Sequence, residues 1–380
     1  MWLALCAGRR GIGPLTRAQS PHLRIAAVCE VPGYDPNAHF DRRDQDELDR
    51  FAQFAVVAAR EAAYGAGLPD GSLDEELMSV TTGCALGGKE TEDAGFWRLY
   101  GEQKSRLSPF SVPRVMASAA ASRIAREFGV RGACSNFSSA CAASAQAVAL
   151  GYMRVASGQA DVAIVGGSEA PLTVGHLMSW DALRIMSPDG CRPFSHDRNG
   201  MTLGEGGAFL VLEERSRAEA RGVRPLAEML GAGESSDAGH LTSPDVVGAT
   251  AAIRRALAAG GVAPERVGYV NAHGTGTLVN DAVEARALHA ALGRSISDVR
   301  VGSTKGAHGH LLGAGGALEA VITVLAIARG CIPPNVGTTK VAPDCDLGIP
   351  LTAEARSIDV ALSNSFAFGG LNAVLAFQRC

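Results

Sequence analysis

Residues 134–144 read Cys134-Ser-Asn-Phe-Ser-Ser-Ala-Cys-Ala-Ala-Ser144, which is typical of a short strand, a tight turn and the start of a helix. The helix is expected to run to about Gly158, because the segment is rich in Ala, Gln, Leu and Met, which are good helix formers. Ser138 or Ser139 is the expected N-cap, which would place Cys141 in the first helical turn. There the positive end of the helix dipole would lower the pKa of the thiol and make it a nucleophile. Taken alone, such a Cys is more often a small buried apolar residue.

The composition is that of a soluble α/β protein. Of the 380 residues, 47% are hydrophobic, 19% are charged and 46 are Gly, which excludes a disordered or fibrous chain. The net charge of −4 argues against a surface for nucleic acid or anionic lipid. The nine Cys residues show no CxxC pair and no metal-ligand spacing, which indicates reduced thiols in the cytoplasm. The longest apolar run, Ala320–Ala328, is well short of the about 18 residues that span a bilayer, so we expect no membrane span.

Strands and helices recur in the same order in two halves of the chain. The helix after Cys141 is matched by an Ala- and Gly-rich helix expected from His310 to Arg329. Because strands alternate with helices, we expect mostly parallel sheets covered by helices, and two copies of one unit packed face to face. We assign residues 1–224 to the first half and 225–380 to the second, with one central site between them. The matching segments are Asp161–Val165 with Asp359–Ser363, and Gly206–Leu212 with Gly369–Leu375.

A Gly-rich loop carries the first histidine of interest. The segment Val270-Asn-Ala-His-Gly-Thr-Gly-Thr277 places His273 just past the end of a strand, where α/β sheets carry ligands. Its Gly residues let a ligand and the backbone come close, and Thr275 and Thr277 add hydroxyl groups. A lone His is nevertheless more often a structural residue.

A second segment, Ser303-Thr-Lys-Gly-Ala-His-Gly-His-Leu-Leu-Gly313, contains Lys305 and His310, and we expect His310 to open a helix. Glu319 is the only charged residue in the apolar run that follows, so it must be paired if this helix is buried. Lys305 is the expected counter-ion, and the pair would help to set the charge on His310. A metal site is the alternative, but no carboxylate or Cys cluster lies at ligand spacing, so we expect no metal.

The last loop is Asn364-Ser-Phe-Ala-Phe-Gly-Gly370. Gly369 and Gly370 follow a strand and indicate backbone amides that are free to point at a ligand, as an oxyanion site requires. In isolation, a simple β-turn is the favoured explanation of the same residues.

Together these segments resemble the β-ketoacyl-(acyl carrier protein) synthases, the condensing enzymes of fatty-acid and polyketide assembly. The resemblance covers essentially the whole chain in family order and is to the chain-elongating type II synthases, including their nodulation-type relatives. The motifs that carry it are Ser139-Ala-Cys-Ala-Ala143, Gly167-Ser-Glu-Ala-Pro-Leu-Thr173, Ser179-Trp-Asp-Ala-Leu-Arg184, Cys191-Arg-Pro-Phe194, Leu203-Gly-Glu-Gly206, Asn271-Ala-His-Gly-Thr-Gly-Thr277, Ser303-Thr-Lys305, Gly309-His310, Pro333-Pro-Asn335 and Asn364-Ser-Phe-Ala-Phe-Gly-Gly370.

This resemblance implies a thiolase-type α/β fold, in which five layers alternate as αβαβα and come from two duplicated halves. It also implies a homodimer, or the active half of a heterodimer with a related subunit, and an acyl carrier protein as partner. The substrates are carried on the phosphopantetheine arm of that carrier, so no further cofactor is expected. The family's first strand would lie ahead of Trp2, so we expect either that this strand is missing or that the start of the chain was assigned too late.

The resemblance implies a decarboxylative Claisen condensation, the 3-oxoacyl-(acyl carrier protein) synthase reaction of an acyltransferase. Cys141 would hold the acyl chain as a thioester. His273 and His310 would promote decarboxylation of a carrier-bound malonyl group and donate hydrogen bonds where enolate charge develops. The carbanion would then attack the thioester and give a chain two carbons longer. Lys305 and Glu319 would orient His310.

Further residues are assigned supporting roles by the same resemblance. The N–H groups of Cys141 and Phe368 would form an oxyanion hole, and Phe368 would gate access to the thiol together with the adjoining glycine pair. Thr275 and Thr277 would contact the pantetheine. His308 stands where Thr is common, and we expect it to be a neighbour of the site and not a third catalyst.

The expected carrier surface departs from the family's pattern. Elongating synthases often carry basic residues there, whereas this chain has Asp44-Gln-Asp-Glu-Leu-Asp49, which is expected to repel an acidic partner. Arg42, Arg43 and Arg198 are the basic residues left for substrate and carrier contacts.

Three related activities are alternatives. A thiolase would need a second Cys near the C-terminal glycine loop, which residues 364–370 lack. An initiating synthase would use Cys-His-Asn in place of Cys-His-His. A non-catalytic chain-length partner of a synthase heterodimer would lack the nucleophile. Because Cys141, His273 and His310 are all present, the active synthase is favoured and the partner subunit is the alternative.

Overall fold

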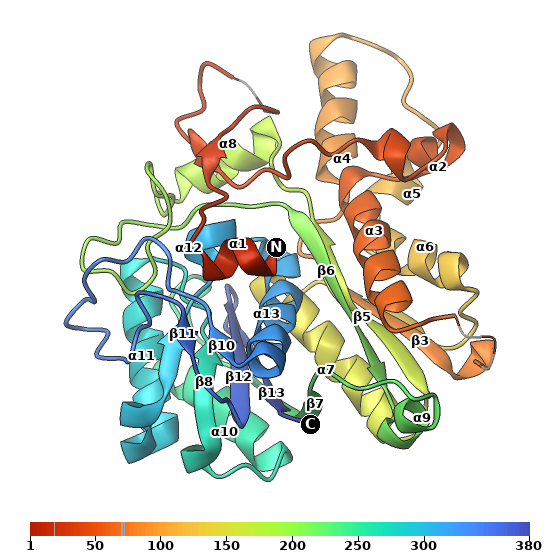
Figure 1. Cartoon of the computed structure of the whole chain (residues 1–380). Helices are drawn as coiled ribbons and strands as arrows, with labels where there is room; N and C mark the ends of the chain where they lie inside the picture. Colours follow the sequence, from red (N-terminus) through yellow and green to blue (C-terminus); the bar gives the residue numbers. More distant parts are fainter. Residues whose placement is uncertain (19, 70, 72) are drawn as a thin grey trace.

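The two larger sheets follow one plan (Figure 1), and two further sheets have two strands each. The computed structural model describes residues 1–380 except 19, 70 and 72. The first sheet has the order β4-β3-β5-β6 and the second has the order β9-β8-β12-β13-β7. The strands are β3 (Met78–Gly83), β4 (Cys134–Phe137), β5 (Val162–Glu169), β6 (Gly206–Glu213), β7 (Glu228–Ser236), β8 (Val267–Asn271), β9 (Arg300–Gly302), β12 (Val360–Ala367) and β13 (Leu371–Gln378).

Both sheets are mixed, so the expectation of mostly parallel sheets is wrong for their last strands. β3 pairs in parallel with β4 and β5, and β8 pairs in parallel with β9 and β12. β5–β6 and β12–β13 are antiparallel pairs. The turn at residues 368–370 joins β12 directly to β13, and such a short connection permits only an antiparallel pair.

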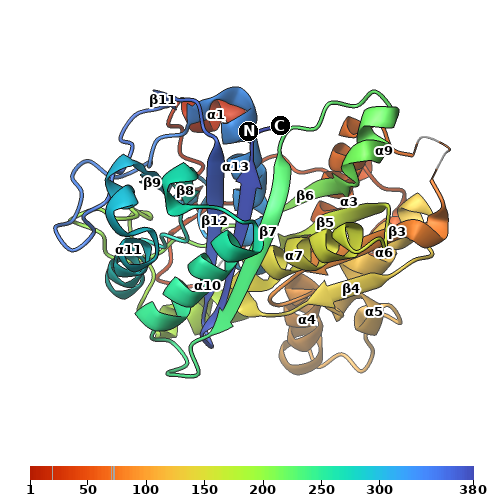
Figure 2. The same cartoon turned by 90° about the horizontal axis from the view of Figure 1, so that it is seen from below.

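Helices cover the sheets in five layers, which agrees with the expected αβαβα order. Figures 1 and 2 show α7 (Ala143–Ala156) and α13 (Gly315–Arg329) between the two sheets. α3 (Arg50–Gly65) and α6 (Ala119–Phe128) cover the outer face of the first sheet. α10 (Val246–Ala259) and α11 (Leu278–Leu292) cover the outer face of the second. The recurrence of strand order and of helix placement confirms the predicted duplication.

Small residues let the central helices approach each other and the first sheet closely. A Cβ on Gly83 would lie 2.2 Å from the backbone N of Ser144, and one on Gly316 would lie 2.9 Å from Ala145 Cβ. The Ser144 hydroxyl accepts a hydrogen bond of 2.8 Å from the N–H of Ala317. Among the described residues, one helical stretch, Leu312–Arg329, is long and apolar enough to cross a membrane, but 78% of it is buried inside the fold. It is the central helix of the core.

The remaining elements differ from the predicted ones mainly where a helix is interrupted. Apolar residues at helical spacing predict one helix over 44–66, but the structure has α2 (Arg42–Glu47) and α3 there, because Asp49 caps α3 by accepting the N–H of Phe51. The sequence likewise predicts one helix from Pro113 to Phe128, where the structure has α5 (Ser111–Val115) and α6. The further elements are α1 (Trp2–Cys6), β1 (Gly13–Pro14), β2 (Ala27–Val28), α2 (Arg42–Glu47), α4 (Lys89–Phe96), α5 (Ser111–Val115), α8 (Val174–Ala182), α9 (Arg215–Ala220), α12 (Lys305–His308), β10 (Cys331–Ile332) and β11 (Glu354–Ala355).

The acidic segment at residues 44–49 is partly neutralised within the chain. Asp44 forms two hydrogen bonds with the Arg123 guanidinium, at 2.5 and 2.7 Å. Glu47 pairs with Arg126, and Asp49 is buried and accepts from Thr91. Two of the four carboxylates are thus paired with arginines and a third is buried, which reduces the repulsion that the sequence predicts toward an acidic partner.

Candidate active site

Cys141 lies in a tight turn between a strand and a helix. A 3-10 turn, Ala140–Ala142, links β4 to α7, and Ala140 has a φ of +47°. This left-handed conformation is unfavourable for a residue with a side chain and is typical of strained functional sites. Neither Ser138 nor Ser139 caps the helix, since the Ser139 hydroxyl donates to the Gln146 side chain instead. Cys141 therefore precedes the α-helix. The prediction that it lies in the first helical turn is wrong.

The surroundings of Cys141 disfavour the thiolate. Burial raises the pKa of the Cys141 thiol to about 11, although the Lys305 ammonium and the N–H of Phe368 act in the opposite direction. The expected lowering of this pKa is therefore wrong. Because the thiol is buried, the cost of desolvating the thiolate exceeds the stabilisation that Lys305 and the N–H of Phe368 provide.

The alkylation of Cys141 by iodoacetamide is expected to accelerate about tenfold per pH unit from pH 7 to 9, because only the thiolate reacts. The sign follows from a pKa near 11, which leaves the thiolate fraction rising throughout that range. Rates would be measured by peptide mass spectrometry. A rate that levels off near pH 7 would contradict this prediction.

His310 and His273 lie together against the thiol. His310 Nε2 is 3.1 Å from Cys141 Sγ, and the two imidazole centroids are 5.3 Å apart with their planes at 83°. The prediction that His310 opens a helix is wrong. It lies between α12 and the 3-10 turn Leu312–Ala314, and its N–H donates to the carbonyl of Thr202 at 2.6 Å. Two distant loops and the Cys141 turn thus converge on one site between the duplicated sheets.

The hydrogen bonds of both imidazoles specify which ring nitrogen carries the proton. His273 Nδ1 lies 3.4 Å from Lys305 Nζ, and an ammonium can only donate. His310 Nδ1 accepts the N–H of Leu312 at 3.3 Å. Burial and the charge of Lys305 lower the pKa of both imidazoles well below the usual value, so both are neutral at pH 7. Each ring therefore holds its proton on Nε2.

This proton placement decides between a metal site and an anion site. Ligand atoms of Cys141, His273 and His310 lie within 4.8 Å of one another, which is close enough to surround a metal ion. A metal ligand needs a free lone pair on the ring nitrogen. Because both Nε2 atoms carry protons, the pair of imidazoles fits a developing negative charge better than a cation.

Lys305 and Glu319 form a buried ion pair, as the sequence predicts. Burial raises the pKa of Glu319 to about 7, while Lys305 acts to lower it. The pair positions His273, whereas the sequence predicts that it orients His310, because Lys305 Nζ contacts His273 Nδ1 at 3.4 Å. Its charge still lowers the pKa of His310, after the larger effect of burial.

The turn between β12 and β13 directs one amide at the nucleophile. The N–H of Phe368 hydrogen-bonds to Cys141 Sγ and favours the thiolate. The N–H of Gly369 donates to the carbonyl of Leu241 at 2.7 Å, and that of Gly370 donates to Ala367 at 3.1 Å. The expectation that Gly369 and Gly370 offer free amides is therefore wrong. Both have positive φ, +84° and +70°, and serve to form the turn that places Phe368.

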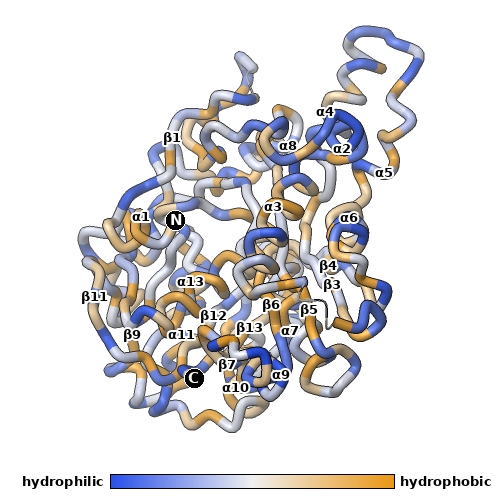
Figure 3. The backbone as a smooth tube through the Cα atoms, turned by 45° about the vertical axis from the view of Figure 1, so that its right-hand side comes forward, coloured by the Kyte–Doolittle hydropathy of each residue, from blue (hydrophilic) through white to orange (hydrophobic). Residues whose placement is uncertain are grey.

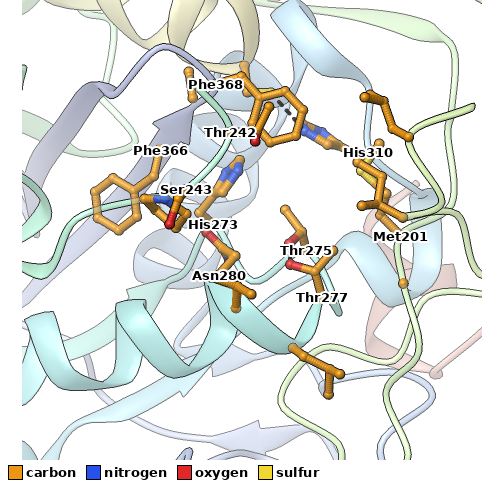
Figure 4. A pocket seen from close by; sticks show the side chains of 18 of the residues that line it. Met201, Thr242, Ser243, His273, Thr275, Thr277, Asn280, His310, Phe366 and Phe368 are labelled. Atoms are coloured by element: carbon orange, nitrogen blue, oxygen red, sulfur yellow. Dashed lines mark hydrogen bonds between the residues drawn. The ribbon is translucent and has the colours of Figure 1, made fainter. Parts of the chain in front are cut away.

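A cavity of about 320 Å³ gives access to this group (Figure 4). Thr275 and Thr277 line it, with their Oγ1 atoms 2.9 Å apart. Figure 4 shows both hydroxyl groups across the cavity from Phe368. Exposed apolar side chains, Leu241 and Leu278 among them, line its outer part. The cavity is thus polar near the reactive groups and apolar at its rim.

Arg198 does not line this cavity, which corrects its assignment to substrate contacts. Its side chain is 2% exposed and donates to Asp344 at 2.7 Å and to the carbonyl of Ser195 at 3.1 Å. It also lies 3.8 Å from Asp281. Arg198 therefore acts as a buried structural cation, whereas Arg42 and Arg43 are exposed.

Two acidic residues that sequence reasoning missed hold the His273 loop in place. Glu284 accepts the N–H groups of His273 and Gly274, at 2.9 and 2.7 Å. Asp281 accepts the N–H of Gly276 at 3.2 Å. Both are fully buried. Their spacing of three residues on the buried face of an expected helix was the available signal, since a buried carboxylate needs partners.

Comparisons with known proteins agree over the whole chain. Residues 1–218 match the family described as Beta-ketoacyl synthase, N-terminal domain, and residues 226–339 match Beta-ketoacyl synthase, C-terminal domain. "Nodulation protein E" of Rhizobium sp. (strain N33) is 40% identical over 380 residues, covering 100% of this chain and 94% of the relative. "3-oxoacyl-[acyl-carrier-protein] synthase 2" of Synechocystis sp. is 40% identical over 387 residues, covering 100% and 93%.

A solved structure described as "The ishigamide ketosynthase/chain length factor" superimposes with a TM-score of 0.94 at 34% identity, covering 100% of this chain and 94% of that one. This chain belongs to the β-ketoacyl synthase family, the condensing acyltransferases of fatty-acid and polyketide biosynthesis.

Proposed function

We propose that Cys141 is the acyl acceptor of a 3-oxoacyl-(acyl carrier protein) synthase. The observation that carries this is the set of donors around Sγ: His310 Nε2 at 3.1 Å and the N–H of Phe368. The thiol sulfur attacks the acyl thioester carbonyl, and the carrier thiol leaves with the proton that Cys141 loses. The N–H groups of Phe368 and Cys141 stabilise the tetrahedral oxyanion of this transfer.

The two imidazoles then act on the malonyl unit. Its thioester carbonyl lies between the Nε2–H groups of His273 and His310, and loss of CO₂ leaves an enolate whose charge these donors stabilise. The enolate carbon attacks the acyl group on Cys141, the C–S bond breaks, and the thiol regains a proton. Lys305 supports the step because it fixes the His273 tautomer with its proton directed at the substrate.

The carrier arm is proposed to enter through the cavity beside Thr275 and Thr277. Their hydroxyl groups lie near the histidines and can accept or donate to the amides of a pantetheine chain. The Synechocystis relative is named "3-oxoacyl-[acyl-carrier-protein] synthase 2", which supports the same class of partner here. We place the reaction in the cytoplasm, since all nine Cys are free thiols.

Product formation tests this function. The protein is incubated with one carrier protein that bears an acyl chain and one that bears a malonyl group. It is expected to release CO₂ and to form a carrier-bound 3-oxoacyl chain two carbons longer than the acyl chain supplied. Cys141→Ala is expected to lose this product completely. Condensation by Cys141→Ala, or none by a folded wild-type protein with any acyl chain length offered, would refute the proposal and favour the non-catalytic partner subunit.

We propose further that subunits pair through the projection between α4 and α5, seen at the upper right of Figures 1 and 3. Much of the projecting loop is hydrophilic in Figure 3, but its helical base exposes large apolar side chains. These are Phe96, Trp97, Tyr100, Leu107, Phe110, Val112 and Met116. Exposed apolar surface of this kind marks interaction sites. The ishigamide structure combines a ketosynthase with a chain length factor, so a related subunit is an alternative to a second copy.

The pairing of subunits can be measured by analytical ultracentrifugation. The wild-type chain is expected to sediment as a dimer, and Trp97→Glu with Tyr100→Glu is expected to shift it to monomer, because these side chains are 67% and 74% exposed in the single chain. An unchanged dimer in the double variant would contradict the assigned surface. A monomeric wild-type chain would favour the heterodimer.

A further inference from the structure

Trp180 stacks on Phe368, whose side chain lines the same cavity as Cys141. The rings of Trp180 and Phe368 have centroids 6.0 Å apart and planes at 26°. Phe368 is also the residue whose N–H reaches Cys141 Sγ. Trp180, Phe368 and Cys141 all line the same cavity. A change at Trp180 can therefore reach the nucleophile through a single intervening residue.

Trp180 is itself held by a hydrogen bond within its helix. Its Nε1–H donates to His176 Nε2 at 2.6 Å, one helical turn earlier on α8, and the two rings meet edge to face with planes at 79°. This bond needs a neutral His176. Burial and the charge of Lys89 lower the pKa of His176 to about 4, so its Nε2 is free to accept at pH 7.

The two sides of the stack differ in how firmly they are fixed. α8 is anchored by the fully buried Leu177 and by the Arg24–Asp181 ion pair. Phe368 lies in a turn that continues into two Gly residues with positive φ, which tolerate larger backbone rearrangements than other residues. If the ring of Phe368 moves to admit an acyl chain, it moves against a fixed Trp180.

We infer that Trp180, held by His176, is a positioning residue that stabilises the closed state of Phe368 over Cys141. Closed, Phe368 keeps its N–H on Sγ; open, it exposes the thiol and gives up that hydrogen bond. The inference rests on the proposed role of Cys141 and adds a residue that sets how often the site opens. Loss of the stack increases access to the thiol and weakens the alignment needed for acyl transfer.

The rate of Cys141 alkylation by iodoacetamide at fixed pH measures this access. Trp180→Ala is expected to raise the rate about 2- to 12-fold, which is what a stacked pair of about 0.5–1.5 kcal/mol gives at 1.36 kcal/mol per tenfold. Phe368→Ala is expected to raise it at least as much, and the double variant no further. Additive effects, or a Trp180→Ala rate within error of wild type, would overturn the inference.

Controls separate the stack from general loosening of the fold. Tyr64→Ala breaks another aromatic pair, Tyr64–Phe128 at 6.2 Å, far from the cavity, and is expected to leave the rate unchanged. Alkylation of the buried Cys191, read in the same digest, reports unfolding. His176→Phe, which lacks the acceptor, is expected to raise the rate, and His176→Gln, which retains one, is expected to restore it. Equal rates in these two variants would refute the role of His176.

Loss of the Trp180 stack is expected to change kcat and KM differently from loss of a catalytic group. Trp180→Ala is expected to lower kcat for condensation while leaving KM for the acyl carrier lower or unchanged, because entry becomes easier and alignment worse. A rise in KM alone would contradict the inference and indicate a simple binding wall. Alkylation requires no turnover, so it remains informative even if no acyl adduct forms on Cys141, the result that would refute the proposed function.

Discussion

His273→Ala is expected to slow decarboxylation of a malonyl thioester by about 10²–10³-fold, the usual cost of removing one oxyanion donor. Acylation of Cys141 is expected to persist in this variant, because the contacts of Sγ are with His310 and Phe368. His310→Ala is expected to impair both steps. Release of CO₂ and the mass of the acylated protein would measure the two steps separately.

The controls for this experiment are chemical and positional. His273→Gln keeps an N–H donor and is expected to recover part of the decarboxylation. His308→Ala is the positional control: its ring bonds to Thr304 and to the carbonyl of Gly309, and it does not line the cavity. Equal losses in His308→Ala and His273→Ala would mean that the effect is structural.

Lys305→Ala is expected to destabilise the fold by about 3–5 kcal/mol, because it leaves a buried carboxylate at Glu319 without its cation. The loss is expected to shrink toward low pH. Glu319 has a pKa of about 7 in the folded protein and 4.5 as its reference, so the folded state binds the extra proton between these values. The free energy of unfolding therefore falls as the pH rises through this window.

Urea denaturation at pH 5 and at pH 8 would measure this effect. Lys305→Met combined with Glu319→Gln removes both charges and is expected to recover much of the stability lost by Lys305→Ala. A free energy of unfolding for Lys305→Ala that is less than about 1 kcal/mol below wild type at pH 8 would contradict the account. So would a double variant that is less stable than either Lys305→Met or Glu319→Gln alone.

Much of the site could be predicted from residue patterns. Cys141 and the two histidine loops each have weak signals, but the repetition of strand and helix order implied two packed halves that share one site. The lone charge of Glu319 in an apolar helix required a partner, and Lys305 was correctly identified. These inferences rely on periodicity and on the cost of buried charge. Both can be identified from the order of the residues without knowledge of the fold.

The remaining features depend on contacts between distant segments. The tautomers follow from Lys305 Nζ and the N–H of Leu312, and neither contact could be assigned without the fold. Burial of Cys141 reverses the pKa shift expected from a helix terminus alone. The burial of Arg198, which excludes it from substrate contacts, cannot be predicted from a short motif because it depends on the packing of distant segments. Local helix breaks, such as that at Asp49, depend on capping partners that compete with a continuous apolar pattern.

The central claim is tested most directly by incubating the protein with a carrier protein that bears an acyl chain. The intact mass of the protein is then measured, and the adduct is located by peptide mapping. The account predicts a single acyl adduct that maps to Cys141, persists in His273→Ala and is absent from Cys141→Ala. An adduct on another Cys, or an equal adduct in Cys141→Ala, would contradict the assignment of Cys141 as the nucleophile.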